Sequence, residues 1–509
     1  MAYARNLSAR LRHASMTRRS QRSDHADRLP QSWVLGLLGA ALLARLLFIV
    51  LVPFFIRPDE VFQFLEPAHR LVTGQGAVTW EWHAHIRSWL LPGVIAPILW
   101  VSAALGFGHS IEAVQSVLAV ASLGLVYAAI RFGETFGGRP GGLFCGVLMA
   151  FWPDPMLFGT HTLSEIQGGN LLDVATLAGT ILLARERVSW TAWFGIGLLL
   201  GLAIILRFHL IPGVLPLLAF AVLPPVRQHR TRAVPMLLLG LALPVLGQAI
   251  LDDLTLGSPL QSMWKNFDLN IGKGAAATYG VMSPLFYPAR LSQLWGASTV
   301  PVLVCFVFGF RIAPLPAITA LVVIAAHSAV GHKEFSFIYA ALPLMLMVAG
   351  LGATRLLARY GWTDPRSRTI AAFVMLASGL LTTLSGYKPI IREGSDFVGL
   401  ARDARSRPDL CGEAQYVGSS EWWALAGGYS VLDRNVPIYL IRSPAAFAES
   451  APGFNVVIAN KALLPTLPTA YRQIECLHEM CLLQRDASCR QTPINLLESV
   501  PGLGLQAHH

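Results

Sequence analysis

The chain has 509 residues, of which 54% are hydrophobic and only 13% are charged, and its formal net charge is +10. Soluble globular domains carry roughly 25% charged residues, so this composition excludes an ordinary soluble enzyme. Most basic residues are arginines beside apolar runs, so the positive charge indicates membrane topology and no nucleic-acid partner is expected.

Residues 1–31 are polar and rich in arginine, without the small-residue cleavage site of a signal peptide. We predict that they form a disordered basic cytoplasmic tail. Residues 32–386 consist of repeated apolar runs, and about 20 apolar residues in a helix span a bilayer core. They therefore predict an all-α polytopic membrane module. We expect eleven crossings, at 33–56, 112–132, 141–158, 168–184, 190–206, 209–225, 233–250, 298–311, 315–330, 338–357 and 369–386.

The arginines between these runs predict an orientation, because loops rich in arginine stay on the cytoplasmic side. If the first span runs outward, every second loop is both cytoplasmic and basic. Those loops hold Arg131, Arg139, Arg185, Arg187, Arg227, Arg230, Arg232, Arg311, Arg355, Arg359, Arg366 and Arg368. The apolar segment 92–106 is short for a crossing, and we expect a re-entrant or partly inserted helix there.

Residues 387–509 follow the last crossing on the outer side. Their helix and strand patterns predict a small mixed α/β soluble domain. This domain holds Cys411, Cys476, Cys481 and Cys489. An even number of cysteines in a small outward domain is typical of disulfides in an oxidising compartment. The alternative is a zinc site at Cys476 and Cys481.

The outward loops carry charged side chains that a membrane scaffold does not need, and such residues usually line a polar cavity. The first of these loops begins with the sequence RPDE, residues 57–60, where a helix is expected to end. A carboxylate there could take a proton from an acceptor hydroxyl, as a general base does. The alternative is an interfacial acid pair, solvated or bound to Arg70 or Arg87.

Basic residues in later outward loops could hold a phosphate as point charges. His332 and Lys333 lie at the outer end of one predicted helix, and Arg207 ends another. The alternative for the first two is an ordinary polar turn in which Glu334 balances Lys333. Arg45 lies halfway along the first apolar run, where a structural ion pair with an inward acid is favoured.

Taken together, these segments resemble glycosyltransferase family 22, a family of polytopic mannosyltransferases. The resemblance is strongest in RPDEVFQFLEPAHRLVTGQGAVTWEW (57–82) and IRSWLLP (86–92), followed by HKEFSFIY (332–339). The chain departs from the family at Ser336, where an arginine is usual, and at Arg57, where a histidine is usual.

The resemblance implies a GT-C fold and a polyprenyl-phosphate-mannose donor. It implies an inverting transfer of mannose to a hydroxyl of a lipid-linked or other glycan acceptor, which forms an α-mannosidic bond. One base is needed, and we expect Asp59, with Glu60 second. The residues expected to bind the donor phosphate are Arg207, His332 and Lys333, and those expected to bind substrate are Glu66, His69, Trp80, Glu81, Arg87, Glu165, Asn270 and Tyr279. No metal ligand and no certain cofactor are assigned, and use of a divalent metal stays open.

Two other functions are weighed. One is a GT-C enzyme with a different polyprenyl-phosphate sugar. The other is a lipid or sugar transporter, which is less favoured because no internal repeat is visible. Abundant arginine, scarce lysine and the lack of an outward glycosylation sequon favour a bacterial inner membrane with the site facing the periplasm. The endoplasmic reticulum membrane, with the site facing the lumen, is the alternative. Membrane lipids are expected partners in either case.

Overall fold

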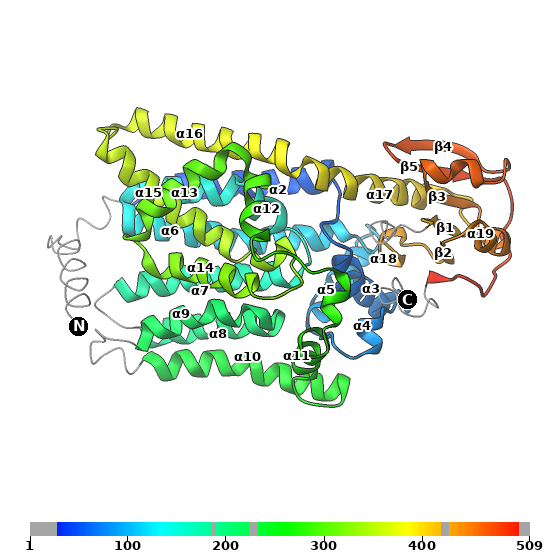
Figure 1. The fold of residues 1–509 in the computed structure, drawn as a ribbon, viewed down its shortest axis with the longest axis horizontal. Coiled ribbons are helices and arrows are strands. Elements are labelled where there is room, and N and C mark those ends of the chain that lie inside the picture. The colour runs from blue at the N-terminus through cyan, green and yellow to red at the C-terminus, as the bar shows by residue number, and fades with distance from the viewer. Residues whose placement is uncertain (1–27, 185–188, 223–232, 419–426, 498–509) are drawn as a thin grey trace.

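The computed structural model describes residues 28–184, 189–222, 233–418 and 427–497. Figure 1 shows the helices lying side by side in one elongated bundle, with a small sheet at one end. Residues 1–27 of the predicted cytoplasmic tail lie outside the described residues.

Apolar helices build the bundle. Among the described residues, seven are long and apolar enough to cross a membrane, and four more apolar helices are shorter. The bundle contains α2 (Gln31–Leu51), α6 (Ile111–Phe151), α7 (Ser164–Ala184), α8 (Trp190–Leu206), α9 (Ile211–Val222), α10 (Ala233–Leu256), α13 (Thr299–Phe310), α14 (Pro314–Ser328), α15 (Ala341–Arg359) and α16 (Pro365–Thr382). Within the described residues, each predicted crossing overlaps one of these helices. The chain is an integral membrane protein, which confirms the predicted class.

One element, α6, contains two of the predicted crossings. The helix reverses at Gly138, whose φ of 62° and ψ of −159° are outside the helical range. A Cβ at Gly133 would lie 2.2 Å from the carbonyl oxygen of Gly141, so the two backbones touch on either side of the turn. Residues 112–132 and 141–158 were predicted as separate crossings, and α6 places them as two antiparallel helices in contact.

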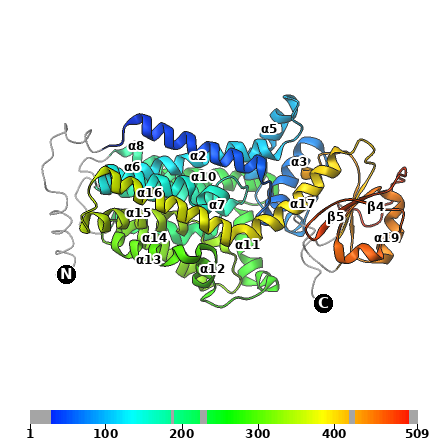
Figure 2. The same cartoon turned by 90° about the horizontal axis from the view of Figure 1, so that it is seen from above.

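The outer side of the bundle carries short elements that build the polar end of the molecule. The apolar segment 92–106 corresponds to α5 (Leu90–Ala104), which lies at this end beside α3 (Glu66–Thr73) and not among the long helices (Figure 2). The other short elements are η1 (Glu60–Leu65), α4 (Trp80–His83), η2 (Asp154–Phe158), η3 (Phe208–Leu210), α11 (Gln261–Phe267), η4 (Asp268–Gly272), η5 (Ala275–Tyr279), α12 (Phe286–Trp295), η6 (Gly296–Ser298), η7 (Phe335–Ile338) and η8 (Thr383–Tyr387).

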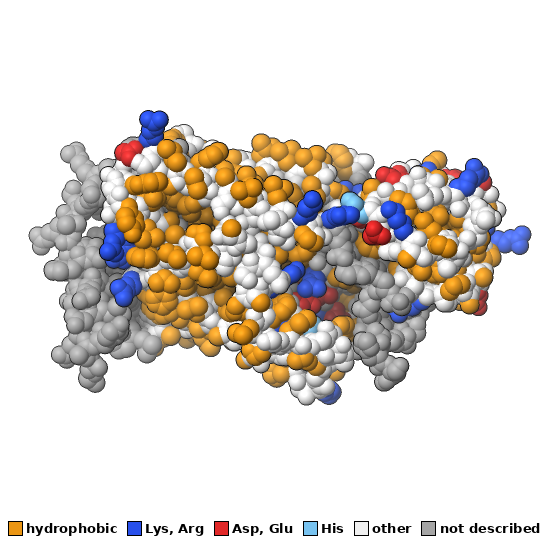
Figure 3. Space-filling view, turned by 45° about the horizontal axis from the view of Figure 1, so that its top comes forward, with side chains coloured by type: hydrophobic (Ala, Val, Ile, Leu, Met, Phe, Trp, Pro, Cys, Tyr) orange, Lys and Arg blue, Asp and Glu red, His pale blue; other side chains and the backbone are white. Residues whose placement is uncertain are grey.

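Apolar side chains cover most of the bundle surface in Figure 3, whereas acidic side chains gather near the sheet and its junction with the bundle. Leu51 on α2 and Leu254 on α10 are exposed by 71% and 79%. A surface of this kind matches the hydrocarbon core of a bilayer.

Arg45 is buried within α2, and its partners differ from the predicted ion pair. Its guanidinium donates to the carbonyl oxygens of Ala150 at 2.9 Å, Pro155 at 3.2 Å and Met149 at 3.3 Å. These carbonyls lie at the C-terminal end of α6 and just beyond it, where helix carbonyls lack partners within the helix. The prediction of an acidic partner was wrong, because the negative end of a helix supplies the acceptors instead.

The C-terminal domain is a five-stranded sheet in the order β2-β1-β3-β5-β4. Its strands are β1 (Glu413–Tyr416), β2 (Ile438–Ile441), β3 (Val456–Asn460), β4 (Arg472–Leu477) and β5 (Met480–Gln484). β1 pairs in parallel with β2 and β3, whereas β5 pairs antiparallel with β3 and β4. The chain reaches the sheet through α17 (Lys388–Ser406), which continues from α16 out of the bundle (Figure 1). Shorter elements complete it: α18 (Tyr429–Leu432), α19 (Pro444–Ser450), η10 (Ala451–Gly453) and η11 (Lys461–Thr466).

One face of the sheet shares a hydrophobic core with the first outward segment. Val61 and Leu65 of η1, Leu91 of α5, Leu400 of α17 and Ile458 of β3 are all buried in this cluster. The sheet is therefore packed against the segment that follows the first membrane span.

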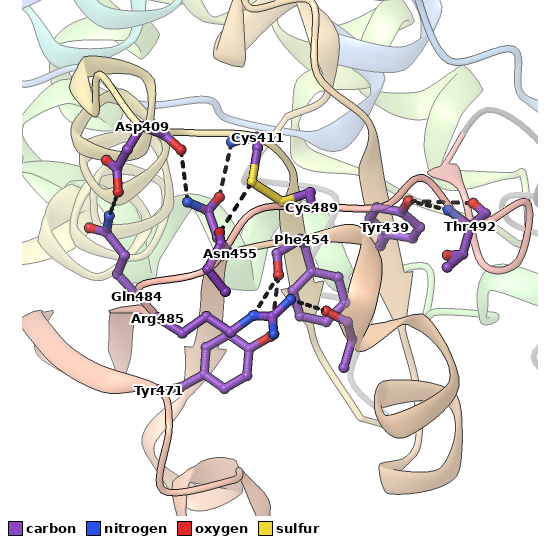
Figure 4. Close-up of a disulfide and its surroundings, with 12 residues drawn as sticks. Asp409, Cys411, Tyr439, Phe454, Asn455, Tyr471, Gln484, Arg485, Cys489 and Thr492 are labelled. Atoms are coloured by element: carbon purple, nitrogen blue, oxygen red, sulfur yellow. Dashed lines mark hydrogen bonds between the residues drawn. A yellow bond between two sulfur atoms is a disulfide. The ribbon is translucent and has the colours of Figure 1, made fainter.

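The four cysteines of the sheet domain form two disulfides, Cys411–Cys489 and Cys476–Cys481. Their bonding excludes the alternative of a zinc site at Cys476 and Cys481. Figure 4 shows the first disulfide beside Asn455, whose side chain accepts from the backbone N–H of Cys411 at 3.0 Å and donates to the carbonyl of Asp409 at 2.8 Å. The disulfide thus fastens the C-terminal part of the domain to the segment that enters β1.

Close packing of α13 on α15 depends on glycine. A Cβ at Gly352 would lie 1.8 Å from the carbonyl oxygen of Cys305, so Gly352→Ala forces the two helices apart. We expect this substitution to lower the free energy of unfolding by about 1–3 kcal/mol, the usual cost of overpacking. The control is Gly36→Ala, because a Cβ at Gly36 meets nothing within 4 Å. Thermal unfolding of the detergent-purified variants measures the difference, and equal midpoints would contradict this packing.

Candidate active site

Asp59 lies between the end of α2 and the start of η1, and its side chain is half-buried. Among the described residues, none donates a hydrogen bond to its carboxylate. The charged groups that act on it are Glu334, Glu81, Arg87 and Glu165. Burial, followed by the carboxylates of Glu334 and Glu81, raises the pKa of Asp59 to about 7, although the Arg87 guanidinium acts in the opposite direction. A carboxylate without partners and with such a pKa is suited to proton transfer near neutral pH.

The neighbouring Glu60 has a different environment. Its buried carboxylate accepts from the backbone N–H groups of Ile56 at 2.6 Å, Arg57 at 3.4 Å and Thr162 at 3.3 Å, and it also lies 2.7 Å from His161 Nδ1. Each carboxylate oxygen therefore has partners within the protein. Glu60 was the second choice for the base, and its geometry supports a structural role instead.

Two acid–arginine pairs face Asp59 from other elements. Arg87 pairs with Glu81, and both side chains are largely buried. Arg207 Nε, at the end of α8, lies 3.2 Å from the buried carboxylate of Glu165 at the start of α7. Both carboxylates and Arg87 act electrostatically on Asp59, so residues from three sequence segments converge there. The expectation that they belong to one substrate-binding site stays a prediction.

His332 and Glu334 close another side of the site. The carboxylate of Glu334 lies 3.4 Å from His332 Nε2 and 3.7 Å from Arg57 Nε. Burial raises the pKa of Glu334, but Arg57 and His332 outweigh burial and hold that pKa well below its usual range. Glu334 is therefore a fixed negative charge, which in turn keeps Asp59 protonated to a higher pH.

Lys333, the residue between His332 and Glu334, contacts backbone carbonyls. Its buried Nζ donates to the carbonyl oxygens of Met282 at 3.1 Å, of Val330 and of Gly331 at 3.4 Å. The ammonium thereby ties two outward loops together. Lys333 was expected to bind the donor phosphate, and the structure gives it backbone contacts instead.

The expected aromatic and amide contacts come from the loop 268–282. Trp80 Nε1 donates to the hydroxyl of Tyr279 at 3.1 Å, and the Tyr279 ring lies 6.0 Å from the His332 ring. Asn270 donates to Asn266 at 2.9 Å, and Asn266 lines the cleft described next. These three predicted residues therefore lie around the same loop.

A small cleft opens beside the acid–arginine pairs. Arg87 and Arg207 contribute positive charge to its lining, whereas Ile205, Leu206 and Phe208 contribute apolar surface. Two guanidinium groups beside an apolar wall are suited to a lipid phosphate, because arginine binds phosphate and the wall accommodates hydrocarbon.

Two residues expected to bind substrate instead face the sheet domain. The buried carboxylate of Glu66 accepts from the backbone N–H and hydroxyl of Ser430, at 2.7 and 2.6 Å. His69 Nε2 lies 3.5 Å from the carboxylate of Asp433. These side chains connect α3 to the sheet domain, and a role for them in binding substrate stays a prediction. A buried carboxylate needs hydrogen-bond donors around it. Spacing along the sequence did not show that Ser430 donates to Glu66 or that His161 contacts Glu60.

Comparisons with known proteins identify the family of this chain. Residues 37–397 match the Alg9-like mannosyltransferase family. The chain belongs to this family. Membership confirms the resemblance to glycosyltransferase family 22 and the assignment to a class of membrane glycosyltransferases.

Curated relatives of this Alg9-like chain include two proteins named GPI mannosyltransferase 3. The Drosophila melanogaster protein is 27% identical over 332 residues, which cover 60% of this chain and 54% of the relative. The Yarrowia lipolytica protein is 29% identical over 327 residues, 59% of each chain. The matched region thus spans a little over half of these relatives.

A solved structure confirms the GT-C fold. ArnT from Cupriavidus metallidurans, crystallised with undecaprenyl phosphate, superposes with a TM-score of 0.56 over 91% of this chain and 100% of ArnT. The sequences are 12% identical, so this likeness concerns the fold alone.

The contrast between adjacent acids predicts two different mutant phenotypes. Glu60→Ala leaves buried N–H donors without an acceptor, at a cost of about 1–3 kcal/mol for each, and we expect a clear loss of thermal stability. Asp59→Ala removes no hydrogen bond from the described residues and serves as the control. Similar unfolding midpoints for the two variants would contradict the structural role of Glu60.

The raised pKa of Asp59 predicts a pH dependence. A base must be ionised, so transfer should rise with pH up to about 7 and level off above it. Arg87 lowers this pKa, so Arg87→Gln should move the acid limb to higher pH. Arg442→Gln, on an exposed residue of the sheet domain, is the control. Profiles of kcat/KM against pH measure the shift. If the acid limb of Arg87→Gln stays at the wild-type pH, Arg87 does not act on the pKa of the base.

Proposed function

We propose that this chain is an inverting mannosyltransferase that uses a polyprenyl-phosphate-mannose donor. In this reaction an acceptor hydroxyl attacks the anomeric carbon of mannose. The new carbon–oxygen bond forms as the bond to the donor phosphate breaks, and the polyprenyl phosphate leaves. Attack opposite the leaving group converts a β-linked donor to an α-mannosidic product.

The observation that carries this proposal is the position of Asp59 among buried charged residues at the outer end of the first span. Its carboxylate has no hydrogen-bond partner among the described residues and has a raised pKa, so it can accept the hydroxyl proton. A single base suffices for an inverting transfer. The adjacent acid, Glu60, accepts hydrogen bonds from the backbone, and we propose that it holds the chain around this base.

The cleft lined by Arg87 and Arg207 offers a place for the phosphate leaving group. As the phosphate bond breaks, negative charge grows on the phosphate oxygens, and preorganised cations stabilise such charge. Arg207 and Arg87 line the cleft, and His332 faces the same group of acids. The phosphate does not need a general acid, since phosphate is already a good leaving group. These contacts do not assign a metal ion to the reaction.

The names of the curated relatives support mannose as the transferred sugar and a glycolipid as acceptor. Trp80 and Tyr279, joined by a hydrogen bond, offer aromatic surface for a sugar at the edge of the site. We place the protein in a bacterial inner membrane with its site facing the periplasm, on the sequence grounds given above. The relatives come from eukaryotes, which makes the endoplasmic reticulum membrane the alternative.

The decisive experiment is transfer of radiolabelled mannose by detergent-purified protein, with polyprenyl-phosphate mannose as donor and a membrane lipid extract as acceptor. We expect Asp59→Asn to reduce kcat by about 10²–10⁴-fold while it retains donor binding, because only the base is lost. Asp253→Asn, an exposed acid at the outer end of α10, should transfer at the wild-type rate.

Three outcomes would change this proposal. Unchanged transfer by Asp59→Asn would remove Asp59 as the base. Transfer from another polyprenyl-phosphate sugar, with none from the mannose donor, would replace mannose. A wild-type protein that binds no polyprenyl-phosphate sugar would exclude the donor class.

A further inference from the structure

Three polar side chains from distant segments meet where the first outward segment contacts the sheet domain. They are His69 on α3, His109 just before α6, and Asp433 just after α18. His69 Nε2 lies 3.5 Å and His109 Nδ1 lies 2.7 Å from the same oxygen, Asp433 Oδ1. One potential metal-binding atom from each residue lies within 4.8 Å of the other two.

The protonation of His69 follows from its other nitrogen. His69 Nδ1 lies 2.7 Å from the carbonyl oxygen of Gln75, which can only accept a hydrogen bond, so Nδ1 carries a proton. In a neutral ring, Nε2 then holds a lone pair. This atom is buried and makes no hydrogen bond to a described residue. A lone pair that faces a carboxylate oxygen is repelled, and either a second proton on the ring or a metal ion between the two atoms removes this repulsion.

Asp433 is held so that its other oxygen is already occupied. Oδ2 accepts from Arg405 Nη2 at 2.8 Å and from the backbone N–H of His109 at 3.0 Å. Gly108 has a φ of 68°, and a Cβ there would lie 2.6 Å from Arg405 Nη2 and 2.7 Å from Asp433 Oδ2. These contacts turn Oδ1 toward the two imidazoles. A histidine with Nδ1–H on a carbonyl and a carboxylate held by donors are typical of metal ligands.

We propose that His69, His109 and Asp433 bind a divalent transition metal ion of the zinc type. Zinc takes imidazole nitrogen and carboxylate oxygen at about 2.0–2.2 Å in tetrahedral sites, which separates ligand atoms by about 3.3 Å. The His69–Asp433 distance already fits, and the His109 ring must withdraw slightly from Asp433. The His109 side chain is 23% exposed, so the ion and a water as fourth ligand can enter. Arg405 keeps its hydrogen bond to the other carboxylate oxygen of Asp433, Oδ2.

The ion would join the sheet domain to the segment that carries the base. α3 follows η1 directly, and η1 begins beside Asp59. The same helix contacts the sheet domain through Glu66 and Ser430. A bound metal would therefore stabilise the docked arrangement of the two domains and would not itself touch the sugar.

The test is metal binding by the full chain, purified in detergent without a histidine tag. After treatment with a chelator and dialysis against zinc, we expect about one zinc per chain by elemental analysis and a rise of several degrees in the unfolding midpoint. His109→Asn and Asp433→Asn should lose both the metal and the zinc-dependent rise. The matched control, His83→Asn on an exposed histidine of the same outward segment, should retain both.

The result that overturns the proposal is a wild-type chain that binds no more zinc than His109→Asn. Nitrogen NMR of labelled histidine would then show a doubly protonated His69 ring, which identifies the cluster as an ion pair only. Because His109→Asn removes no hydrophobic side chain from the core, its unfolding midpoint without zinc checks that the variant folds.

Discussion

The buried carboxylate of Glu60 is the contact on which the reactive end of the molecule depends. Its oxygens accept from the backbone between α2 and η1 and meet His161 and Thr162 before α7. Such a carboxylate is stable away from water only because donors surround it. It thereby fixes the chain where Asp59 leaves the membrane. Among the described residues none donates a hydrogen bond to the Asp59 carboxylate, whereas Glu60 has several donors.

Charge balance explains the arrangement around Asp59. A site at the end of a membrane helix has little water to stabilise isolated ions, so acids and arginines lie in pairs. Glu81 pairs with Arg87, and Glu165 with Arg207. A donor phosphate would enter an environment whose arginines already have carboxylate partners, so their positive charge is held in place before the lipid arrives. Positioned charge of this kind costs no reorganisation during the reaction.

The sheet domain completes the site's framework from the other side. Its inner face shares a core with η1 and α5, and the Glu66 carboxylate accepts hydrogen bonds from the backbone N–H and the hydroxyl of Ser430 in the sheet domain. Part of the motif that resembles glycosyltransferase family 22 therefore holds two domains together. A motif residue can thus be necessary for activity without touching substrate, because it fixes the helix that follows the base.

The sequence alone determined the membrane class, the positions of the apolar helices and the family, and it predicted Asp59 as the base. These features depend on apolar run length and on local motifs, which folding does not alter. Tertiary structure decided which charged residues meet. It gave Glu60 buried hydrogen-bond partners that the adjacent Asp59 lacks among the described residues, and it placed Lys333 against backbone carbonyls. It also gave Arg45 acceptors at the end of a helix and paired the cysteines. Such partners come from segments up to hundreds of residues apart, and spacing along the chain does not specify which of them the packing of helices and sheet brings together.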